Sequence, residues 1–478
     1  MSHRIMSVLA LLALFAVACD RSADRITADR VTGTLQPTAA ASASQTIGIN
    51  VLLSAAPTAA QLAELGTYGR VSGKLLEINA VFLRASASQL PAIQALPYVL
   101  AAGPDAERLG APVDAVPVPD FTIGISTWNL DAVDVTDIRL GPDRTIAYDG
   151  TGVYVGVLDT GLLDSWRQYF PQERIAEQYA ASFGGGGVGG DNVSQQPNKW
   201  EHDQNSHGTH VTSIILGYSL FGSLINGVAP KATVIPVKVL NQSGLGWSSV
   251  IAQGIMYIAD LKAGPLAGHP VVINLSLGGP RLDPVEQAAI NYAIAHGVIV
   301  VASAGNEGNA GMSFPAAYAP VISVAASGWI GEWQPGSDGL VGNWWFADDV
   351  ADPTVADDFY IPPFSSRATA GQDLDIAAPG TWVVGPFQLQ SGKIDYFFLG
   401  GTSMSSPHVA GIVALMAQKN NSLTATEAEA ILEATAVPLP AGSRTIHNPD
   451  GSTSVFSWLA NATGAGLVIA DSAVTHTP

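Results

Sequence analysis

One serine, one aspartate and one histidine, far apart along the chain, each stand in a setting suited to acyl transfer. Ser403 follows a turn of small residues and precedes the apolar run 409–416, which predicts a buried helix. Backbone N–H groups and the positive end of the helix dipole would then stabilise the negative charge that develops on a carbonyl oxygen under attack. By itself, however, a serine in this position is more often a plain helix cap.

Asp159 and His207 could supply the partners that such a serine needs. Asp159 follows the apolar run 153–158, which is typical of a buried parallel strand. The carboxyl ends of such strands are where open α/β sheets place their chemistry. His207 opens a second helix-like run at 207–216. Because a serine hydroxyl is a weak nucleophile, it needs a base, and the base needs a third group that orients it and stabilises its charged form.

Four segments of the chain resemble the motifs of the subtilisin-like serine proteases and follow one another in the family's order. They are LDTG at 158–161, HGTHV at 207–211, VVASAGNEG at 300–308 and GTSMSSPHVA at 401–410. The resemblance implies a serine endopeptidase in which Asp159 orients the base His207 and Ser403 is the nucleophile. It also implies that the Asn306 side chain and the Ser403 backbone N–H stabilise the oxyanion, and that the chemistry requires no cofactor.

The same resemblance implies a cleft in which an extended peptide adds as a strand between two backbone edges, next to a specificity pocket. None of the residues concerned is charged, so we expect broad cleavage that favours apolar or aromatic residues before the cut bond. The residues are Ser276, Leu277 and Gly278 on one edge, Gly244 and Gly246 on the other, and Ser303, Ala304 and Gly305 along one wall of the pocket.

Each of these residues also has an ordinary structural interpretation. His207 and His210 could be metal ligands, although no carboxylate or cysteine cluster accompanies them. Asn306, taken alone, is typical of a turn; Asp159 could cap a helix, and His408 is typical of a packed helix residue. Two other functions share the motifs: a catalytically silent binding protein on the same fold, and an esterase or peptide ligase that uses the same triad.

From about residue 127 onward, predicted strands alternate with predicted helices. This pattern predicts an α/β fold, with a mainly parallel sheet and helices on both faces, over a catalytic domain at 127–478. The strands are expected at 153–158, 232–239, 271–276, 298–304 and 321–325, and the helices at 248–261, 284–296, 403–419 and 424–434.

The N-terminus has the features of an export signal. Residues 1–18 combine an early arginine, a short apolar run and an Ala-Val-Ala cleavage site, which together indicate a signal peptide rather than a transmembrane span. Cys19, the only cysteine, follows at once, as in bacterial lipoproteins, although Ala16 stands where a leucine is usual. We expect a secreted, extracellular protein, either cut before an unmodified Cys19 or made as a precursor anchored to the membrane through a lipid on Cys19.

Three segments precede the catalytic domain. Residues 19–46 are interpreted as a linker. Residues 47–105 predict a small α+β unit, whose length and place resemble the family's inhibitory propeptides; an unrelated small domain is the alternative. The resemblance implies that this unit inhibits its own enzyme. Residues 106–126 contain three prolines and are expected to be an exposed processing linker, with Leu109 and Phe121 as candidate residues before the cut.

The net charge of the chain limits the classes of partner that it could bind. The 478 residues carry a formal net charge of −19; residues 1–105 hold 7 basic and 6 acidic side chains, so the acidity belongs to the rest. Such acidity argues against nucleic-acid binding and leaves carboxylates available for structural calcium, whose ligands the sequence does not identify. Residues 328–364, rich in Trp and Asp, could bind calcium, contact substrate or cover the fold. We expect protein or peptide substrates and a monomer.

Overall fold

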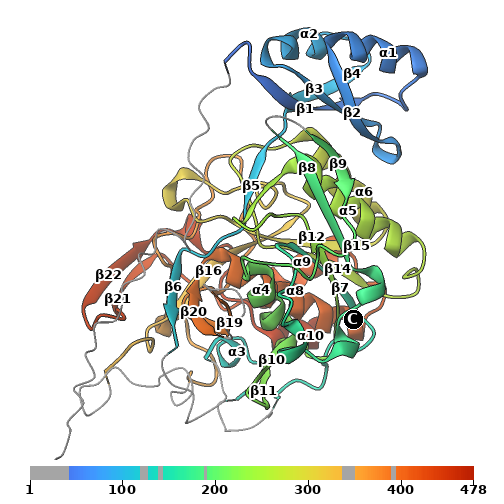
Figure 1. The fold of residues 1–478 in the computed structure, drawn as a ribbon. Coiled ribbons are helices and arrows are strands. Elements are labelled where there is room, and N and C mark those ends of the chain that lie inside the picture. Colours follow the sequence, from blue (N-terminus) through green and yellow to red (C-terminus); the bar gives the residue numbers. More distant parts are fainter. Residues whose placement is uncertain (1–41, 119–127, 138–143, 188–190, 336–349, 389–394) are drawn as a thin grey trace, which may run out of the picture.

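The computed structural model describes residues 42–118, 128–137, 144–187, 191–335, 350–388 and 395–478. The expected signal peptide, Cys19 and Phe121 lie outside the described residues, as does the middle of the segment 328–364. The described chain forms a small N-terminal unit and a larger unit that carries the central sheet (Figure 1). Within these ranges, no helix combines the length and the apolar character that crossing a membrane requires.

The central sheet has the order β17-β16-β15-β14-β7-β12-β8-β9, and β18 pairs with β16. The strands from β16 to β8 run parallel, whereas β9 and β17 are antiparallel to their neighbours. The bounds are β7 (Tyr154–Asp159), β8 (Ala181–Gly186), β9 (Asp191–Gln195), β12 (Thr233–Lys238), β14 (Val271–Leu275), β15 (Val298–Ser303), β16 (Ile322–Trp329), β17 (Phe359–Tyr360) and β18 (Ile376–Pro379).

Helices cover both faces of this sheet, so the predicted fold class is confirmed. Alternate residues of β15 enter different cores: Val298 and Val300 pack with the cluster of α5 and α6, whereas Ile299 and Val301 pack with that of α4, α8, α9 and α10. Burial on both faces explains the uninterrupted apolar runs of the strands. The helices are α4 (His207–Leu216), α5 (Ser248–Ala263), α6 (Pro284–Ala295), α8 (Thr402–Lys419), α9 (Ala425–Thr435) and α10 (Ala470–His476).

Shorter elements complete the larger unit. Hairpins form between β10 and β11 and between β21 and β22, while β19 pairs with β20 and β13 lies apart from the central sheet. Their bounds are α3 (Trp128–Asp131), β10 (Gly217–Leu220), β11 (Ser223–Asn226), β13 (Leu245–Trp247), β19 (Val383–Pro386), β20 (Tyr396–Gly400), β21 (Gly442–His447) and β22 (Thr453–Trp458).

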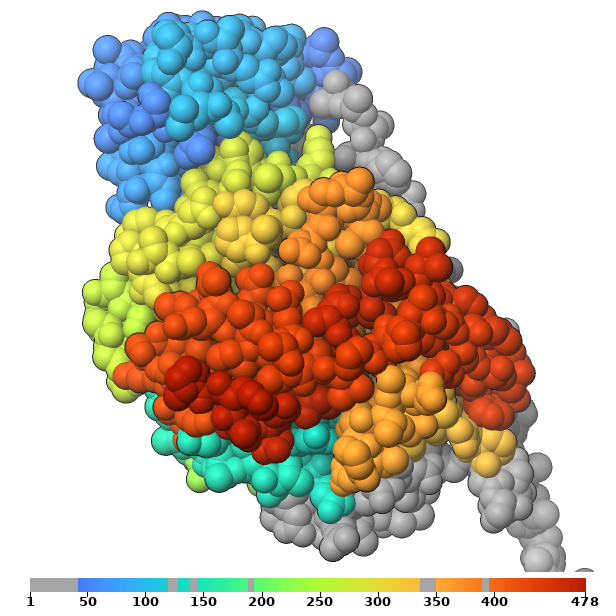
Figure 2. Space-filling view, turned by 180° about the vertical axis from the view of Figure 1, so that it is seen from behind, coloured from blue at the N-terminus to red at the C-terminus, as the bar shows by residue number. Residues whose placement is uncertain are grey.

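The N-terminal unit is an antiparallel sheet of order β2-β3-β1-β4 with α1 and α2 on one face (Figure 1). Its opposite side rests on α6 and β9 of the larger unit. Figure 2 shows the unit seated on the larger unit from behind. Leu75 and Phe82 join the core of the larger unit. The bounds are β1 (Thr46–Leu53), α1 (Ala59–Tyr68), β2 (Gly69–Leu75), β3 (Ala80–Ser86), α2 (Leu90–Gln94) and β4 (Val99–Pro104).

The mostly apolar stretch at 74–83 does not form one continuous strand in this unit. A 3-10 turn at Leu76–Ile78 divides it, and Asn79 follows with a left-handed φ of 56°. Asparagine tolerates that conformation, so it can turn the chain where the apolar pattern continues without a break. The result is two strands, β2 and β3, that pair as a hairpin.

The expectation of an exposed linker is wrong over residues 106–118. This segment packs against the larger unit and forms two short strands. β5 (Glu107–Leu109) pairs with β13, and β6 (Asp114–Pro117) pairs with β20. The Arg108 side chain is fully buried. Prolines are unfavourable in the interior of a helix, but they are compatible with short extended segments at the edge of other strands. The proline content therefore did not reveal that this segment is buried against the larger unit.

Part of the Trp- and Asp-rich segment is packed core. Trp329 stacks on Trp128 with ring centroids 6.3 Å apart, and Trp333 contacts Phe398 edge-on at 4.9 Å. Both tryptophans are buried. Of the three interpretations of this segment, covering the fold is the one that its described residues support.

Glu332 in this segment should make stability depend on pH. Its buried carboxyl accepts hydrogen bonds from Tyr360 Oη (2.6 Å) and Thr381 Oγ1 (2.5 Å), and burial raises its pKa from 4.5 to about 8. The folded chain thus holds this proton more tightly than the unfolded chain. The resulting stability is fully present below about pH 4.5 and is lost as the pH rises through 8.

Glu332→Gln should remove this loss. Between pH 5 and pH 9, urea denaturation should show the wild-type free energy of unfolding fall by on the order of 3 kcal/mol more than that of the variant. Parallel curves for the two proteins would contradict the assignment.

Candidate active site

The end of β7 and the start of α4 bring Asp159 and His207 together. His207 Nδ1 lies 2.8 Å from Asp159 Oδ1 and 3.0 Å from Oδ2, and both side chains are buried. This approach depends on Gly208, because a Cβ there would lie 2.4 Å from the Gly161 carbonyl oxygen and 3.2 Å from Asp159 Oδ1. The contact holds the imidazole with Nδ1 toward the acid and Nε2 directed away from it.

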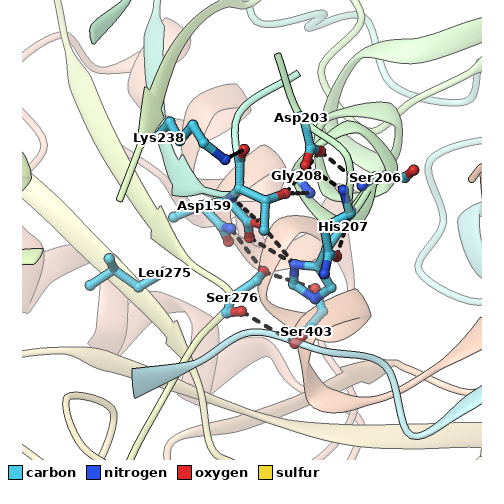
Figure 3. Close-up of polar contacts among 12 residues, drawn as sticks. Asp159, Asp203, Ser206, His207, Gly208, Lys238, Leu275, Ser276 and Ser403 are labelled. Atoms are coloured by element: carbon cyan, nitrogen blue, oxygen red, sulfur yellow. Dashed lines mark hydrogen bonds and ion pairs between the residues drawn. The ribbon is translucent and has the colours of Figure 1, made fainter. Parts of the chain in front are cut away.

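Thr160 and Asp203 link the end of β7 to the start of α4 around Asp159 and His207. Thr160 N–H donates to Asp159 Oδ1 (2.6 Å), and Thr160 Oγ1 donates to Asp203 Oδ2 (2.9 Å) while accepting from Gly208 N–H (2.9 Å). Asp203 also accepts from Ser206 N–H, just before α4 (Figure 3). Burial raises the pKa of Asp203 to about 6. Sequence reasoning did not single out Asp203, which belongs to none of the four motifs.

Ser403 is the second residue of α8, and the His207 ring lies between it and Asp159 (Figure 3). Ser403 Oγ donates to the Ser276 carbonyl oxygen at 3.3 Å, and Ser276 Oγ donates to the Ser403 carbonyl oxygen at 2.8 Å. His207 Nε2 is buried and has no hydrogen-bond partner among the described residues. The structure therefore brings the three predicted residues together, with an unused acceptor on the base beside the hydroxyl.

Asn306 is held beside Ser403 by a residue that the sequence analysis did not weigh. Asn306 Oδ1 accepts from the backbone N–H and from the Oγ1 of Thr402, each at 2.9 Å. Because Oδ1 is engaged by Thr402, Nδ2 is the end of the amide that faces Gly401 and the nearby Pro112. A Cβ on Gly401 would lie 3.7 Å from Asn306 Nδ2 and 3.6 Å from Pro112 Cα. The signal for Thr402 was its place inside the serine motif.

The other two histidines of the motifs make structural contacts. His210 Nε2 lies 3.1 Å from the Val383 carbonyl oxygen, and His408 contacts the Met404 carbonyl oxygen and the Asn129 amide, each at 2.7 Å. Burial lowers the pKa of His210 to about 3 and that of His408 to about 4, so both rings are neutral near pH 7. Since His207 and His210 contact separate partners, the structure does not support the metal interpretation of this pair.

Residues 107–113 run in extended form between the two predicted edges. Leu109 exchanges hydrogen bonds with Gly278 at 2.9 and 3.0 Å, Gly110 N–H donates to the Gly244 carbonyl oxygen at 2.9 Å, and Arg108 pairs with Gly246. Beyond Ser403, Val113 N–H donates to the Gly400 carbonyl oxygen at 2.6 Å. The predicted edges thus bind a strand of this chain, whereas the Leu277 side chain is packed in the core.

Ala111 stands where the strand passes Ser403. It lines one small pocket together with Ser403 and Asn306, and Pro112 follows beside Gly401. The Ala111–Pro112 peptide bond is therefore the bond presented to the serine.

A cavity of about 20 Å³ remains beside Ala111. Ser303 and Gly305 line it, whereas Ala304 is packed in the core behind them. Glu307 also lines it, and its carboxylate accepts from Ser313 Oγ (2.9 Å) and Ser366 Oγ (3.1 Å). This acidic residue follows Asn306 directly, and the sequence analysis did not include it among the pocket residues.

Calcium ligands stay unassigned. Among the described residues, Asp375, Glu429 and Glu433 bring carboxylate oxygens within 4.8 Å of one another. Three carboxylates supply only part of the six to eight oxygens that calcium takes, and Asp375 Oδ2 already accepts two hydrogen bonds from Ser323. Structural calcium remains a prediction.

Sequence comparison places the chain in a known class of enzymes. The chain belongs to the subtilase family, whose sequence model matches residues 150–466. It is 33% identical over 288 residues to thermitase from Thermoactinomyces vulgaris, covering 60% of this chain and 82% of that protein. It is 34% identical over 325 residues to subtilisin Savinase from Lederbergia lenta, covering 68% and 91%. The chain is accordingly a serine endopeptidase by family.

Solved structures support the fold. The structure superposes on fervidolysin from Fervidobacterium pennivorans, a keratinolytic enzyme related to subtilisin, with a TM-score of 0.63 and 21% sequence identity. The match covers 94% of this chain but 63% of that chain, so this protein spans less than two thirds of the fervidolysin length. A match to sphericase has a TM-score of 0.50 at 25% identity and covers 73% of this chain and 99% of that one.

Proposed function

We propose that this protein is an exported, self-processing serine endopeptidase whose catalytic residues are Asp159, His207 and Ser403. His207 Nε2 takes the proton of Ser403 Oγ, and the oxygen attacks the scissile carbonyl carbon. Asn306 Nδ2 and the Ser403 backbone N–H stabilise the oxyanion. His207 then gives its proton to the leaving amine, and water hydrolyses the acyl-enzyme by the reverse sequence.

One observation carries this proposal: a strand of the chain lies in the cleft with one peptide bond presented to Ser403. Asn306 and Ser403 line the small pocket beside Ala111, and the His207 ring, whose Nε2 is free and whose Nδ1 contacts Asp159, lies against Gly110, where an added Cβ would be 3.3 Å from His207 Cε1. A catalytically silent binding protein would have no need for this matched set of an oriented base, a hydroxyl and an oxyanion donor.

The N-terminal unit and the strand that follows it support a role as an intramolecular inhibitor. Residues 107–113 occupy both halves of the cleft and exclude any other peptide from it. The unit is held on the larger unit by Asp105, which accepts from Ser249 N–H (2.9 Å), Ser249 Oγ (2.6 Å) and Gly187 N–H (2.7 Å). We propose that residues 47–105 form a propeptide and that processing follows export, with or without a lipid on Cys19.

The test is hydrolysis of casein by the purified protein, with and without a serine-directed covalent inhibitor. The proposal expects peptide release that the inhibitor abolishes, and a mass increase of one inhibitor group on the peptide that contains Ser403. Release that is insensitive to the inhibitor, or no release from a processed protein, would contradict it. Product analysis with matched peptide and ester substrates separates the two alternatives. An esterase would cleave the ester alone, and a ligase would give joined peptides as products.

The pocket also supports a preference for apolar or aromatic residues before the cut bond. Glu307 is the acidic group of its described lining, and its carboxylate is already engaged by Ser313 and Ser366. A panel of peptides that differ only at this position should therefore show a higher kcat/KM for Phe and Leu than for Lys and Arg. A higher value for Lys or Arg would show that Glu307 governs the pocket instead.

A further inference from the structure

The strand in the cleft carries a buried ion pair three residues before Ala111. The Arg108 side chain is fully buried, and its guanidinium meets the fully buried carboxylate of Glu286 on α6. The contact is bidentate: Nε donates to Glu286 Oε1 at 3.1 Å, and Nη2 donates to Oε2. Such a pair is charge-assisted and geometrically selective for the planar guanidinium.

The receiving site belongs to the larger unit and not to the N-terminal unit. Besides Glu286, Arg108 Nη2 donates to the Arg281 carbonyl oxygen at 3.1 Å. Nη1 donates at 2.9 Å to the Glu107 carbonyl oxygen, a backbone group that any peptide in the cleft would supply. A Cβ on Gly279 would lie 2.9 Å from Nη1, so the absence of a side chain there leaves room for the guanidinium. The groups of the larger unit remain in place after the strand has left the cleft.

Two acidic side chains at the start of α6 make up this part of the site. Glu286 lies in the first turn of α6, and Asp283 caps the same helix by accepting from Val285 N–H (2.8 Å) and Glu286 N–H (3.1 Å). The helix N-terminus stabilises both carboxylates. A buried carboxylate without its partner is costly, so a cleft emptied of Arg108 favours a new cation over an apolar side chain.

The register of the strand defines which residue of a substrate would enter. Ala111 precedes the bond presented to Ser403, so Gly110, Leu109 and Arg108 are the second, third and fourth residues before it. We infer that Glu286, with the Arg281 carbonyl oxygen, forms a subsite that selects arginine at the fourth position before the cut bond. This inference rests on the proposed function, because it takes the strand as a guide to how substrates lie.

Four peptides test the inference with the self-processed enzyme. Their acyl part copies residues 108–111, Arg-Leu-Gly-Ala, and ends in a fluorogenic amine, which avoids the proline at 112. The others replace arginine with lysine, citrulline or leucine. We expect kcat/KM for the arginine peptide to exceed that for citrulline, its neutral isostere, by about 10- to 100-fold, with lysine in between.

Variants of Glu286 assign the preference to this residue. Glu286→Gln should bring the arginine and citrulline peptides within about threefold of each other, and Glu286→Leu should make the leucine peptide the best of the four. Glu173→Gln is the control for net charge, because Glu173 is exposed near the amino end of β12, and it should keep the wild-type order. Equal wild-type values for arginine and citrulline would overturn the inference, whereas no cleavage of any peptide would count against the proposed function.

A second measurement needs no activity. In the full chain with Ser403→Ala, Arg108→Leu or Glu286→Leu alone would leave one charge buried and unpaired, whereas the double variant would replace the pair with apolar groups. We expect hydrogen exchange of the Leu109 and Gly110 amides to be fast in each single variant and slow again in the double variant. Equal exchange in all of these proteins would show that the pair does not hold the strand, and would overturn the inference.

Discussion

Ser403→Ala should lower kcat for peptide hydrolysis by roughly 10⁵-fold or more, because no other group of the site can form the acyl-enzyme. The oxyanion donors and the cleft remain, so a small residual rate above that of water is expected. The same variant should leave the precursor uncut, because self-processing uses the same serine. Activity is measured with a fluorogenic peptide, and processing by the mass of the protein expressed in a host without other proteases.

Ser405→Ala is the matched control for this variant. Ser405 lies one half-turn further along α8, is equally buried, and its hydroxyl has no hydrogen-bond partner among the described residues. Its removal should leave both activity and processing close to wild type. Normal maturation of Ser403→Ala in such a host would show that another nucleophile or another protease makes the cut.

Asp159→Asn should lower kcat by about 10⁴-fold while leaving the fold intact. The carboxylate accepts from His207 Nδ1–H and thereby keeps Nε2 free as the base. An amide can present its NH₂ group to Nδ1 instead, which places the ring proton on Nε2, and it also removes the charge that stabilises the imidazolium. The measurement is kcat with a fluorogenic peptide, together with a thermal melt that shows the variant to be folded.

Asp164→Asn provides the comparison for this change. Asp164 is exposed and lies five residues further along the chain, so its replacement alters net charge by the same amount without touching the histidine. It should keep nearly full activity. An Asp159→Asn enzyme within tenfold of wild type would show that His207 is oriented by other groups.

The sequence alone was sufficient to predict the strands and helices that position the catalytic residues. Residues 298–302 of β15 form an uninterrupted apolar run because both faces of the strand are buried, and a run of this kind is visible without a structure. The helix that begins beside Ser403 was equally visible, because small residues precede a long apolar run. The motifs then indicated which strand and helix ends carry chemistry.

What the sequence did not reveal depends on contacts between distant segments. Thr160 and Asp203 join β7 to α4 across 43 residues of chain, and the Arg108–Glu286 pair joins segments 178 residues apart. Neither pair has a local pattern that marks it. Residues 106–118 were expected to be exposed, but whether such a segment lies in solvent or in a cleft is decided by the surface that it meets.

The strand at 107–117 is joined to the rest of the molecule by peptide bonds on both sides, which fixes how strongly it competes with other peptides. A tethered ligand meets its site at an effective concentration on the order of millimolar, whatever the dilution of the protein. One cut beyond Pro117 would turn this encounter into an ordinary bimolecular one. Dilution would then favour dissociation of the strand from the cleft, so the fraction of active enzyme would depend on the protein concentration.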